Sequence, residues 1–497
     1  MTPRLTPFLF FASFIAITAA CDARAQEHGE EKPGVPFTLG PVDFRATFDA
    51  GLGAFSVENA QFGLGSNSRF AKREGGRTWY EGFVMPGLEF ELPREERGSL
   101  YGRVSAIGAA TRGEGEAGAT SGTSDRPDDV RLEDAFVGWK SGSALEAWLP
   151  KDAIDISVGN QPLVVGDGFL LVNGTLDGFG RAANYLGPSV AFEDTAILRL
   201  NTQPVRADLF HIAGGVDQDL MRGNDNPHTR IVGANVEWFE SSHEDHGRFE
   251  YEERRWYVGL TALNVYDADR NFSFNGTQNT HAAANRDGLS VWSARFGGSF
   301  IPGLDDFALY GEYGIQRNDA RGNGGKVSAN AWYLQPQYTF SGLPWTPMVT
   351  ARYAHFSGDK NPNDRSDRSW DPLYTDAGPR GSTTWTQGQI YSQYVGANTN
   401  LNTWHFGAEV TPFDELTVGL SLFRHYYDEP PQAGARDDHL MDELNLYASW
   451  ETPIKGVAIA PTLGAGRAGK GQQQAGLAPA SDDRTIWLGQ IVLLYKL

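Results

Sequence analysis

The stretch that decides the fold is Ser481-Asp-Asp-Arg-Thr-Ile-Trp-Leu-Gly-Gln-Ile-Val-Leu-Leu-Tyr-Lys-Leu497. Two sets of residues alternate along it. One set is Trp487, Gly489, Ile491, Leu493, Tyr495 and Leu497, and the other is Leu488, Gln490, Val492, Leu494 and Lys496. Successive side chains of a strand point to opposite faces, so this pattern predicts a strand with two distinct faces. Such a strand of about ten residues, with aromatic residues near its ends, is the repeating unit of an outer-membrane β-barrel.

The same alternation recurs along the rest of the chain, with turn-forming residues between the segments. Candidate strands lie near 43–55, 78–92, 99–110, 131–141, 154–163, 189–200, 204–214, 229–240, 255–266, 288–300, 307–317, 327–340, 346–357, 401–411, 416–427, 439–451, 457–466 and 484–497. Their number, eighteen, is even, as a single-chain bacterial barrel requires. We therefore predict an all-β fold, a transmembrane antiparallel β-barrel of about 18 strands.

The links between these segments alternate in length, as the short periplasmic turns and long extracellular loops of a barrel do. Short links rich in Pro, Gly and Asp are 93–98, 201–203, 301–306, 341–345, 412–415 and 453–456. Long links are 56–77, 111–130, 164–188, 215–228, 267–287, 358–400, 428–438 and 467–483. The links 142–153 and 241–254 are long for periplasmic turns.

The alternative is a soluble all-β sandwich or propeller, but no propeller-like repeat is visible and aromatic residues recur at strand ends.

The N-terminus has the pattern of an export signal. Arg4 precedes an apolar run, and Ala23-Arg24-Ala25 is a small-x-small cleavage site. We expect residues 1–25 to be a signal peptide and 26–497 to form one barrel domain. The alternative is a lipoprotein signal with Cys21 acylated.

Composition excludes several classes of function. The formal net charge is −20, which argues against nucleic acid as a partner, since a phosphate binder needs a basic surface. Cys21 is the only cysteine, so cleavage after Ala25 leaves no disulfide, thiolate metal site or cysteine nucleophile. No run of eighteen apolar residues follows the signal, so we expect any membrane span to be made of strands.

If the apolar register faces lipid, the other register faces the lumen. This places arginine, tyrosine and glutamine side chains on the inner wall, where arginines could attract an anionic solute and the others contact sugar rings and hydroxyls. The candidates are Arg103, Arg199, Arg206, Arg295, Arg352, Tyr101, Tyr310, Tyr333 and Gln335. The alternative is a solvated wall on which arginines and carboxylates pair with one another.

Three segments resemble the alginate export family of outer-membrane porins. They are Leu132 to Gly142; Asp155 to Leu170, with Gly159-Asn-Gln161 and Gly166-Asp-Gly-Phe-Leu170; and Arg352 to Tyr374, with Ser357-Gly-Asp359 and Trp370-Asp-Pro-Leu-Tyr374. The resemblance extends over most of the chain after the signal. It implies an eighteen-stranded barrel, an arginine-rich constriction, loops that close the pore, and passive transport of an anionic saccharide.

The long link 358–400 contains candidate gating residues, Asp359, Trp370 and Tyr374, which could fold inward together with Trp385 and Tyr391. Residues 359–371 also carry oxygen ligands suited to calcium, but the EF-hand glycine and glutamate are missing, so a solvated loop is the simpler interpretation. His243 and His246 are more simply part of a polar turn than of a metal site. We expect no metal and no cofactor.

The sequence therefore predicts an outer-membrane porin for an anionic saccharide or another acidic solute. Its other expected partners are outer-membrane lipid and the barrel-assembly machinery. The alternatives are a general porin without solute preference and a structural or adhesive barrel that acts through its extracellular loops. Serine, histidine and carboxylates form no recognisable nucleophile motif, so we do not expect an enzyme.

Overall fold

A computed structural model describes residues 33–63, 76–94, 97–114, 126–172, 174, 182–215, 228–241, 254–268, 286–319, 326–361, 364, 366–375, 387–430, 436–479 and 485–497. The predicted signal peptide, the histidine pair at 243 and 246, and Trp385 lie outside these residues. No helix in the described part is long and apolar enough to cross a membrane.

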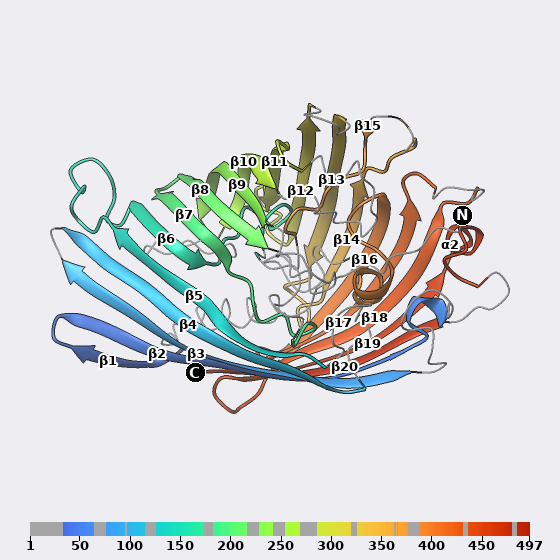
Figure 1. The fold of residues 1–497 in the computed structure, drawn as a ribbon, viewed down its shortest axis with the longest axis horizontal. Coiled ribbons are helices and arrows are strands. Elements are labelled where there is room, and N and C mark those ends of the chain that lie inside the picture. The colour runs from blue at the N-terminus through green and yellow to red at the C-terminus, as the bar shows by residue number, and fades with distance from the viewer. Residues whose placement is uncertain are drawn as a thin grey trace.

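Long antiparallel strands dominate the described residues (Figure 1). Eighteen of them form the wall of a closed barrel: β2 (Val42–Glu58), β3 (Arg77–Arg94), β4 (Gly98–Gly113), β5 (Asp128–Lys140), β6 (Ile154–Gln161), β7 (Phe192–Asn201), β8 (Val205–Gly215), β9 (His228–Ser241), β10 (Arg254–Ala268), β11 (Ser290–Gly298), β12 (Phe307–Asn318), β13 (Lys326–Thr339), β14 (Met348–Phe356), β16 (Leu401–Phe413), β17 (Leu416–Tyr427), β18 (His439–Glu451), β19 (Val457–Ala468) and β20 (Thr485–Lys496). The predicted barrel and its number of strands are confirmed.

Each wall strand pairs with its neighbours in the sequence, and β20 closes the barrel by pairing with β2. β2 extends beyond the end of β20. Lys496, the last residue of β20, pairs with Asp49, and Leu497 exchanges backbone hydrogen bonds with Phe48, whereas β2 begins at Val42. The short strand β1 (Val35–Leu39) pairs with Val42–Ala46 of β2, beyond that point. It thus covers a strand edge that would otherwise expose unpaired backbone groups.

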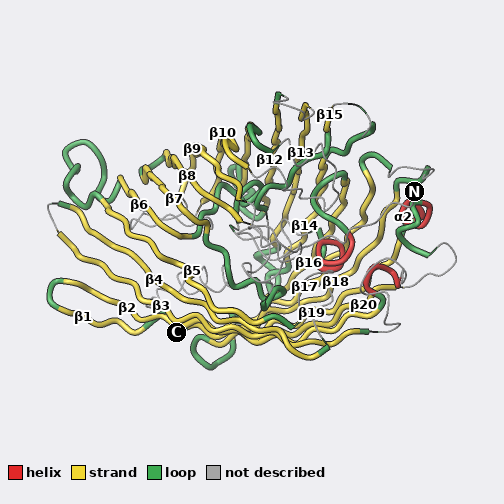
Figure 2. The backbone as a smooth tube through the Cα atoms, viewed as in Figure 1, coloured by secondary structure: helices red, strands yellow, loops and turns green. Residues whose placement is uncertain are grey.

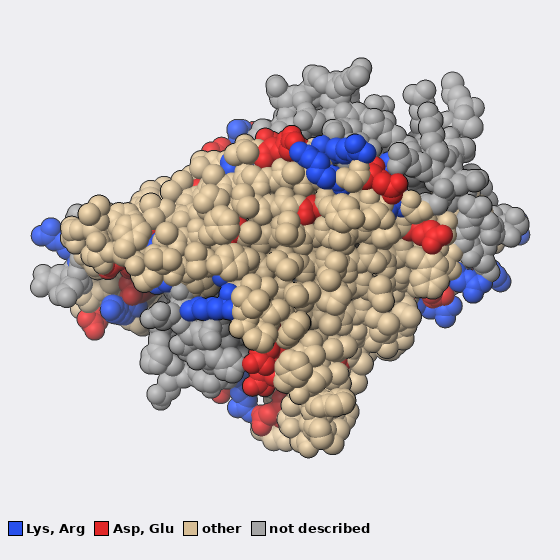
Figure 3. Space-filling model, turned by 90° about the horizontal axis from the view of Figure 1, so that it is seen from below, with Lys and Arg blue, Asp and Glu red and all other residues tan. Residues whose placement is uncertain are grey.

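The outer face of the barrel is apolar, as expected for a surface in contact with lipid. Leu260 and Leu463, for example, are 59% and 63% exposed. An apolar surface patch of this size would be unfavourable in contact with water. Figure 3 shows a broad face with few charges at its centre and most of them near its margins. Tryptophans lie toward both ends of the strands, with Trp238 and Trp450 near the periplasmic side and Trp292, Trp404 and Trp487 near the external side.

Tight turns join strands at the periplasmic end. In the turn from β18 to β19, Gly456 has φ +76°, and a Cβ there would lie 2.1 Å from the carbonyl oxygen of Lys496. Only glycine fits this position. The long link after β5, residues 141–153, makes successive backbone turns and brings Ser141 N–H to the carbonyl of Ile154, at 2.8 Å.

Two loops run through the interior of the barrel (Figure 2). The β6–β7 loop (162–191) contributes the buried residues Leu163, Phe169 and Leu186, and the β14–β16 loop (357–400) contributes Trp370 and Ile390. The second loop also contains β15 (Ser366–Asp367), which pairs in parallel with the start of β13, and the helical turn η4 (Tyr391–Val395). Two further short helices are η1 (Ala60–Gly63) and α2 (Lys470–Gln474). The apolar core of this barrel therefore lies inside it, between the wall and these loops.

Candidate functional site

Three of the predicted lumen arginines lie in the periplasmic halves of β4, β7 and β8. Arg103, Arg199 and Arg206 keep 23%, 19% and 16% of their side chains exposed. Each has a carboxylate close by: Arg103 Nε lies 2.9 Å from Asp134, Arg199 Nη1 lies 3.9 Å from Asp155, and Arg206 Nη2 lies 3.4 Å from Asp208. We name Arg103, Arg199 and Arg206 the lumen arginine cluster.

Tyr101 joins this group through a carboxylate. Its hydroxyl donates a hydrogen bond of 2.5 Å to Asp155, the same side chain that faces Arg199. The ring can reach across β5 because Gly138 lies in between: a Cβ at that position would be 2.4 Å from the ring. Tyr101 therefore orients the carboxylate that faces an arginine, a role that residue type alone did not predict.

A β-bulge in β5 turns two consecutive carboxylates inward. Val104 pairs with Ala135 and Ala106 with Leu132, so Glu133 and Asp134 together oppose Ser105. Both are buried, although strict alternation would place one of them on the lipid side. Asp134 accepts hydrogen bonds from Ser105 Oγ (2.7 Å) and faces Arg103, while Glu133 binds the β6–β7 loop. Strict alternation along β5 could not have predicted this pair.

Arg295 is enclosed by partners and has no exposed side-chain surface. Its guanidinium lies 2.5 Å from Glu237, donates to Thr261 Oγ1 at 2.7 Å, and also contacts Asn235. To reach Glu237 from β11 it crosses Gly259 of β10, where a Cβ would be 2.8 Å from the guanidinium carbon. Arg295 therefore holds the wall together instead of presenting a free cation to the lumen.

The β6–β7 loop is anchored to the opposite wall through Asp167, which is fully buried. Asp167 Oδ2 accepts hydrogen bonds from the hydroxyls of Tyr257 and Tyr333, the latter at 2.9 Å. Next to it, Gly166 (φ +58°) approaches Arg295 so closely that a Cβ would lie 2.5 Å from Nε. Tyr333, predicted to contact solute, thus serves as an anchor for a loop. Asp167 was not among the predicted residues.

Inner-wall glutamates hold both loops through the same pattern of hydrogen bonds, which occurs at three positions among the described residues. Each accepts two successive backbone N–H groups of a loop at 2.7–3.0 Å, which satisfies donors that would otherwise be buried without partners. The pairs are Glu81 with Tyr185 and Leu186, Glu133 with Val190 and Ala191, and Glu443 with Ile390 and Tyr391.

The β14–β16 loop places the predicted gating residues Trp370 and Tyr374 inside the barrel, where they are 1% and 0% exposed. Trp370 packs against Phe169 of the other loop, with ring centroids 5.9 Å apart. The backbones of Tyr374 and Leu170 are also joined, by an N–H to carbonyl bond of 3.2 Å. The two loops therefore form one packed unit.

Charged groups of the link before β11 and of the β14–β16 loop itself stabilise this unit. Arg286 pairs with Asp371 at 3.0 Å and lies over the ring of Tyr374, 5.1 Å from its centroid. Burial raises the pKa of Tyr374, so the phenol remains protonated. Asp359, the third predicted gating residue, is partly buried, and Arg368 bridges it to Asp364 at 3.2 and 3.3 Å. Among the described residues no group of three or more His, Cys, Asp or Glu is arranged to hold a metal ion.

The remaining predicted residues face the interior beneath the loops. Arg352 is 1% exposed and donates to Gln387 Oε1 at 3.4 Å. Tyr310 is partly buried and pairs in register with Gln335, which is 8% exposed. All nine predicted wall residues thus lie on the inner register. The structure divides the five arginines, however, into three that retain exposed surface and two that the loops cover.

Comparisons with known proteins agree with this architecture. Residues 303–431 match the family model described as alginate export. Similar solved structures include a BenF-like porin from Pseudomonas fluorescens Pf-5 (10% identity, 91% of this chain and 98% of that chain covered, TM-score 0.55). They also include Pseudomonas aeruginosa OccK2 (OpdF) in complex with glucuronate (12%, 91% and 96%, 0.52) and P. aeruginosa OpdO (11%, 91% and 97%, 0.51).

No curated protein sequence matches. At 10–12% identity the structural neighbours show a shared fold, that of porin barrels. The family match falls on the segment from the β11–β12 turn to the end of β17, which includes the inward β14–β16 loop and one of the three segments that resembled the family. The chain therefore has the eighteen-stranded β-barrel fold of outer-membrane porins, and its residues 303–431 match the alginate export family.

Proposed function

We propose that the barrel passes acidic saccharides, such as short polyuronates, across the outer membrane by diffusion. The observation that carries the proposal is the lumen arginine cluster, whose side chains lie on the inner face of the wall and keep 16–23% of their surface exposed. Guanidinium groups bind carboxylates through paired, charge-assisted hydrogen bonds. The alginate export match and the glucuronate complex of OccK2 support an acidic sugar as the solute.

A porin without charge preference is the second candidate. The observation in its favour is that carboxylates surround the lumen arginine cluster: Arg103 lies within 4 Å of three, Asp49, Glu89 and Asp134, while Arg199 faces Asp155 and Arg206 faces Asp208. The carboxylates beside these arginines balance their positive charge, so such a pore would pass cations and anions alike.

The test is single-channel recording in planar bilayers under a salt gradient, with and without an oligouronate. We expect anion selectivity and block by the oligomer. Arg103→Gln and Arg199→Gln should each shift the reversal potential toward cation preference and weaken block by about tenfold, the effect of losing one charge-assisted hydrogen bond.

The matched control is Arg230→Gln, which removes the same charge from the exposed outer rim, where Arg230 pairs with Asp267 at 2.6 Å. It should leave selectivity and block unchanged. Cation preference of the unmodified pore would contradict the proposal, and equal permeability to cations and anions, or block that is insensitive to Arg103 and Arg199, would favour the porin without charge preference.

A further inference from the structure

The inner wall carries a partly buried lysine, Lys140, at the periplasmic end of β5. Its side chain points into the barrel, because Trp139 pairs with the outward-facing Ile156 and side chains alternate along β5. On β6 Lys140 lies directly opposite Asp155. Figure 1 shows β4, β5 and β6 side by side along the wall. Lys140 therefore lies at the periplasmic mouth of the lumen.

The ammonium group of Lys140 is held by an aromatic ring. Its Nζ lies over the ring of Tyr101, 4.7 Å from the centroid. Tyr101 pairs in register with Gly138, two residues before Lys140, so the ring lies beside the lysine on the same face of β5. A cation over a tyrosine ring is attracted by the electron density of the ring. This contact positions the ammonium without neutralising its charge.

The carboxylates on the neighbouring strands do not form an ion pair with this lysine. Asp155 is bound by the Tyr101 hydroxyl at 2.5 Å and faces Arg199 at 3.9 Å. Glu91 of β3 lies opposite Tyr101 and is exposed. In the part of the chain that the structure describes, no carboxylate oxygen lies within 4 Å of Lys140 Nζ. The tyrosine thus holds the lysine and also keeps the opposite carboxylate engaged.

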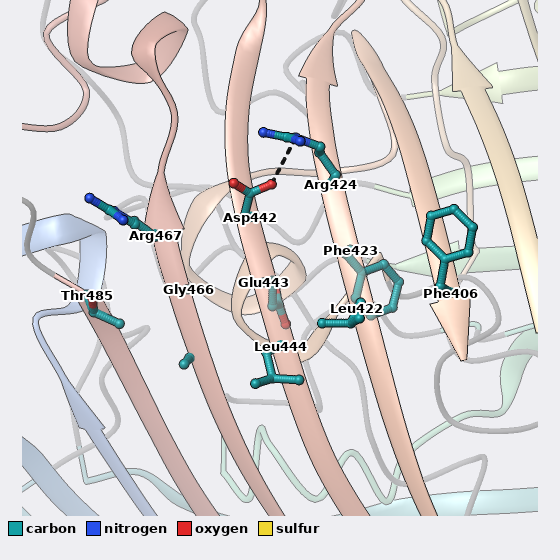
Figure 4. A pocket seen from close by; sticks show the side chains of 11 residues that line it. Phe406, Leu422, Phe423, Arg424, Asp442, Glu443, Leu444, Gly466, Arg467 and Thr485 are labelled. Atoms are coloured by element: carbon teal, nitrogen blue, oxygen red, sulfur yellow. Dashed lines mark ion pairs between the residues drawn. The ribbon is translucent and has the colours of Figure 1, made fainter. Parts of the chain in front are cut away.

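Arginines of the wall are in a different situation. Each member of the lumen arginine cluster has a carboxylate within 4 Å. On the outer face, Arg424 Nε likewise lies 3.1 Å from Asp442 Oδ1 (dashed line in Figure 4). A solute that binds such an arginine competes with a carboxylate of the protein. Lys140 can bind the carboxylate of a solute without first losing an ion pair.

We propose that Lys140 binds a carboxylate of the solute at the periplasmic mouth, with Tyr101 as its positioning residue. Through Tyr101 and Asp155, the lysine is connected to Arg199 of the lumen arginine cluster. A saccharide with several carboxylates can therefore contact the lysine and the cluster at the same time. This inference rests on the proposed transport of acidic saccharides and assigns a periplasmic subsite to it.

The experiment records block of the full-length channel in planar bilayers, with a short oligouronate added to one chamber at a time. We expect Lys140→Gln to weaken block from one chamber about fivefold, the upper range for a partly exposed ion pair. Lys140→Arg should retain most of the block, because a guanidinium also stacks on aromatic rings and binds carboxylates. The matched control is Lys151→Gln, which removes the same charge from an exposed position in the link 141–153 and should leave block unchanged.

A second variant tests the role of the ring. Tyr101→Leu should weaken block about threefold, and Lys140→Gln should then cost less than it does in the unmodified pore, because the ammonium has already lost its position. Fully additive effects would contradict the positioning role of Tyr101.

Two outcomes separate this inference from the function on which it rests. If Lys140→Gln is blocked as strongly as Lys151→Gln from both chambers, while Arg103→Gln weakens block, this inference is overturned and the proposed function stands. If the oligouronate does not block the unmodified pore from either chamber, the proposed function and this inference are overturned together.

Discussion

Arg295 illustrates how a glycine can determine the position of a charge. The guanidinium crosses Gly259 to reach Glu237, and both charged side chains are buried. Removing one partner of a buried ion pair costs about 3–5 kcal/mol, because the other charge is left without compensation. The glycine is therefore as important for this ion pair as the two charged residues.

We predict that Gly259→Val displaces Arg295 and destabilises the barrel by about 3–5 kcal/mol. The measurement is urea unfolding of the refolded barrel in lipid vesicles, followed by tryptophan fluorescence. Gly342→Val in the β13–β14 turn is the control, because a Cβ there meets nothing within 4 Å. Equal stability of Gly259→Val and Gly342→Val would contradict the role assigned to Gly259.

The inward loops are elements whose position depends on buried polar contacts as well as on apolar packing. The β14–β16 loop is joined to the wall where Glu443 Oε1 accepts from Ile390 N–H and Oε2 from Tyr391 N–H, both at 2.8 Å. Tyr391 then stacks on His425, with ring centroids 4.5 Å apart. One carboxylate thus positions η4 at its first turn.

We predict that Glu443→Gln loosens this loop. An amide NH₂ group would replace one acceptor oxygen and face a backbone N–H, so one buried donor would lose its hydrogen bond, at a cost of about 1–3 kcal/mol. Hydrogen exchange of the Ile390 and Tyr391 amides should accelerate, and single-channel recordings should show more frequent changes in conductance.

Glu146→Gln provides the matched control for Glu443→Gln, because Glu146 is exposed in the turn between β5 and β6. Its exchange rates and conductance should equal those of the unmodified protein. Exchange at Ile390 and Tyr391 that is unchanged in Glu443→Gln would show that packing alone holds the loop.

At the scale of the whole molecule, closure depends on the pairing of the first wall strand with the last. Ser56 of β2 lies directly opposite Gly489 of β20, and both belong to the outward register. Directly opposed residues of antiparallel strands bring their Cβ atoms to about 4.5–5.5 Å, close enough for a disulfide after a small adjustment.

We predict that Ser56→Cys with Gly489→Cys, in a Cys21→Ser background, forms a disulfide under mild oxidation. A non-reducing gel after denaturation should show faster migration of the cross-linked chain. Ser56→Cys with Ile491→Cys is the control, since Ile491 pairs with Ala54 and lies diagonal to Ser56. Preferential cross-linking of the control pair would show a different register at the closure.

Local alternation was sufficient to predict most of the barrel. Each of the eighteen predicted segments overlaps an observed wall strand, and the inner register contains all nine predicted wall residues. The reason is physical: a strand in this barrel must show apolar side chains to lipid at every second position, so the periodicity of the sequence records which side faces the membrane. Trp370 and Tyr374 also lie inside the barrel, although the sequence could offer that as one possibility among others.

Contacts between distant segments determine the features that alternation did not predict, namely the bulge in β5 and the exposure and pairing of the arginines. The bulge at Glu133 and Asp134 changes the alternation by one residue, and nothing local to that strand marks it. Whether an arginine is open or enclosed depends on which loop covers it, as Gly166 covers Arg295 and Gln387 meets Arg352. Periodicity determines the direction of a side chain relative to its own strand, but exposure and pairing are properties of groups that meet only once the barrel closes around its loops.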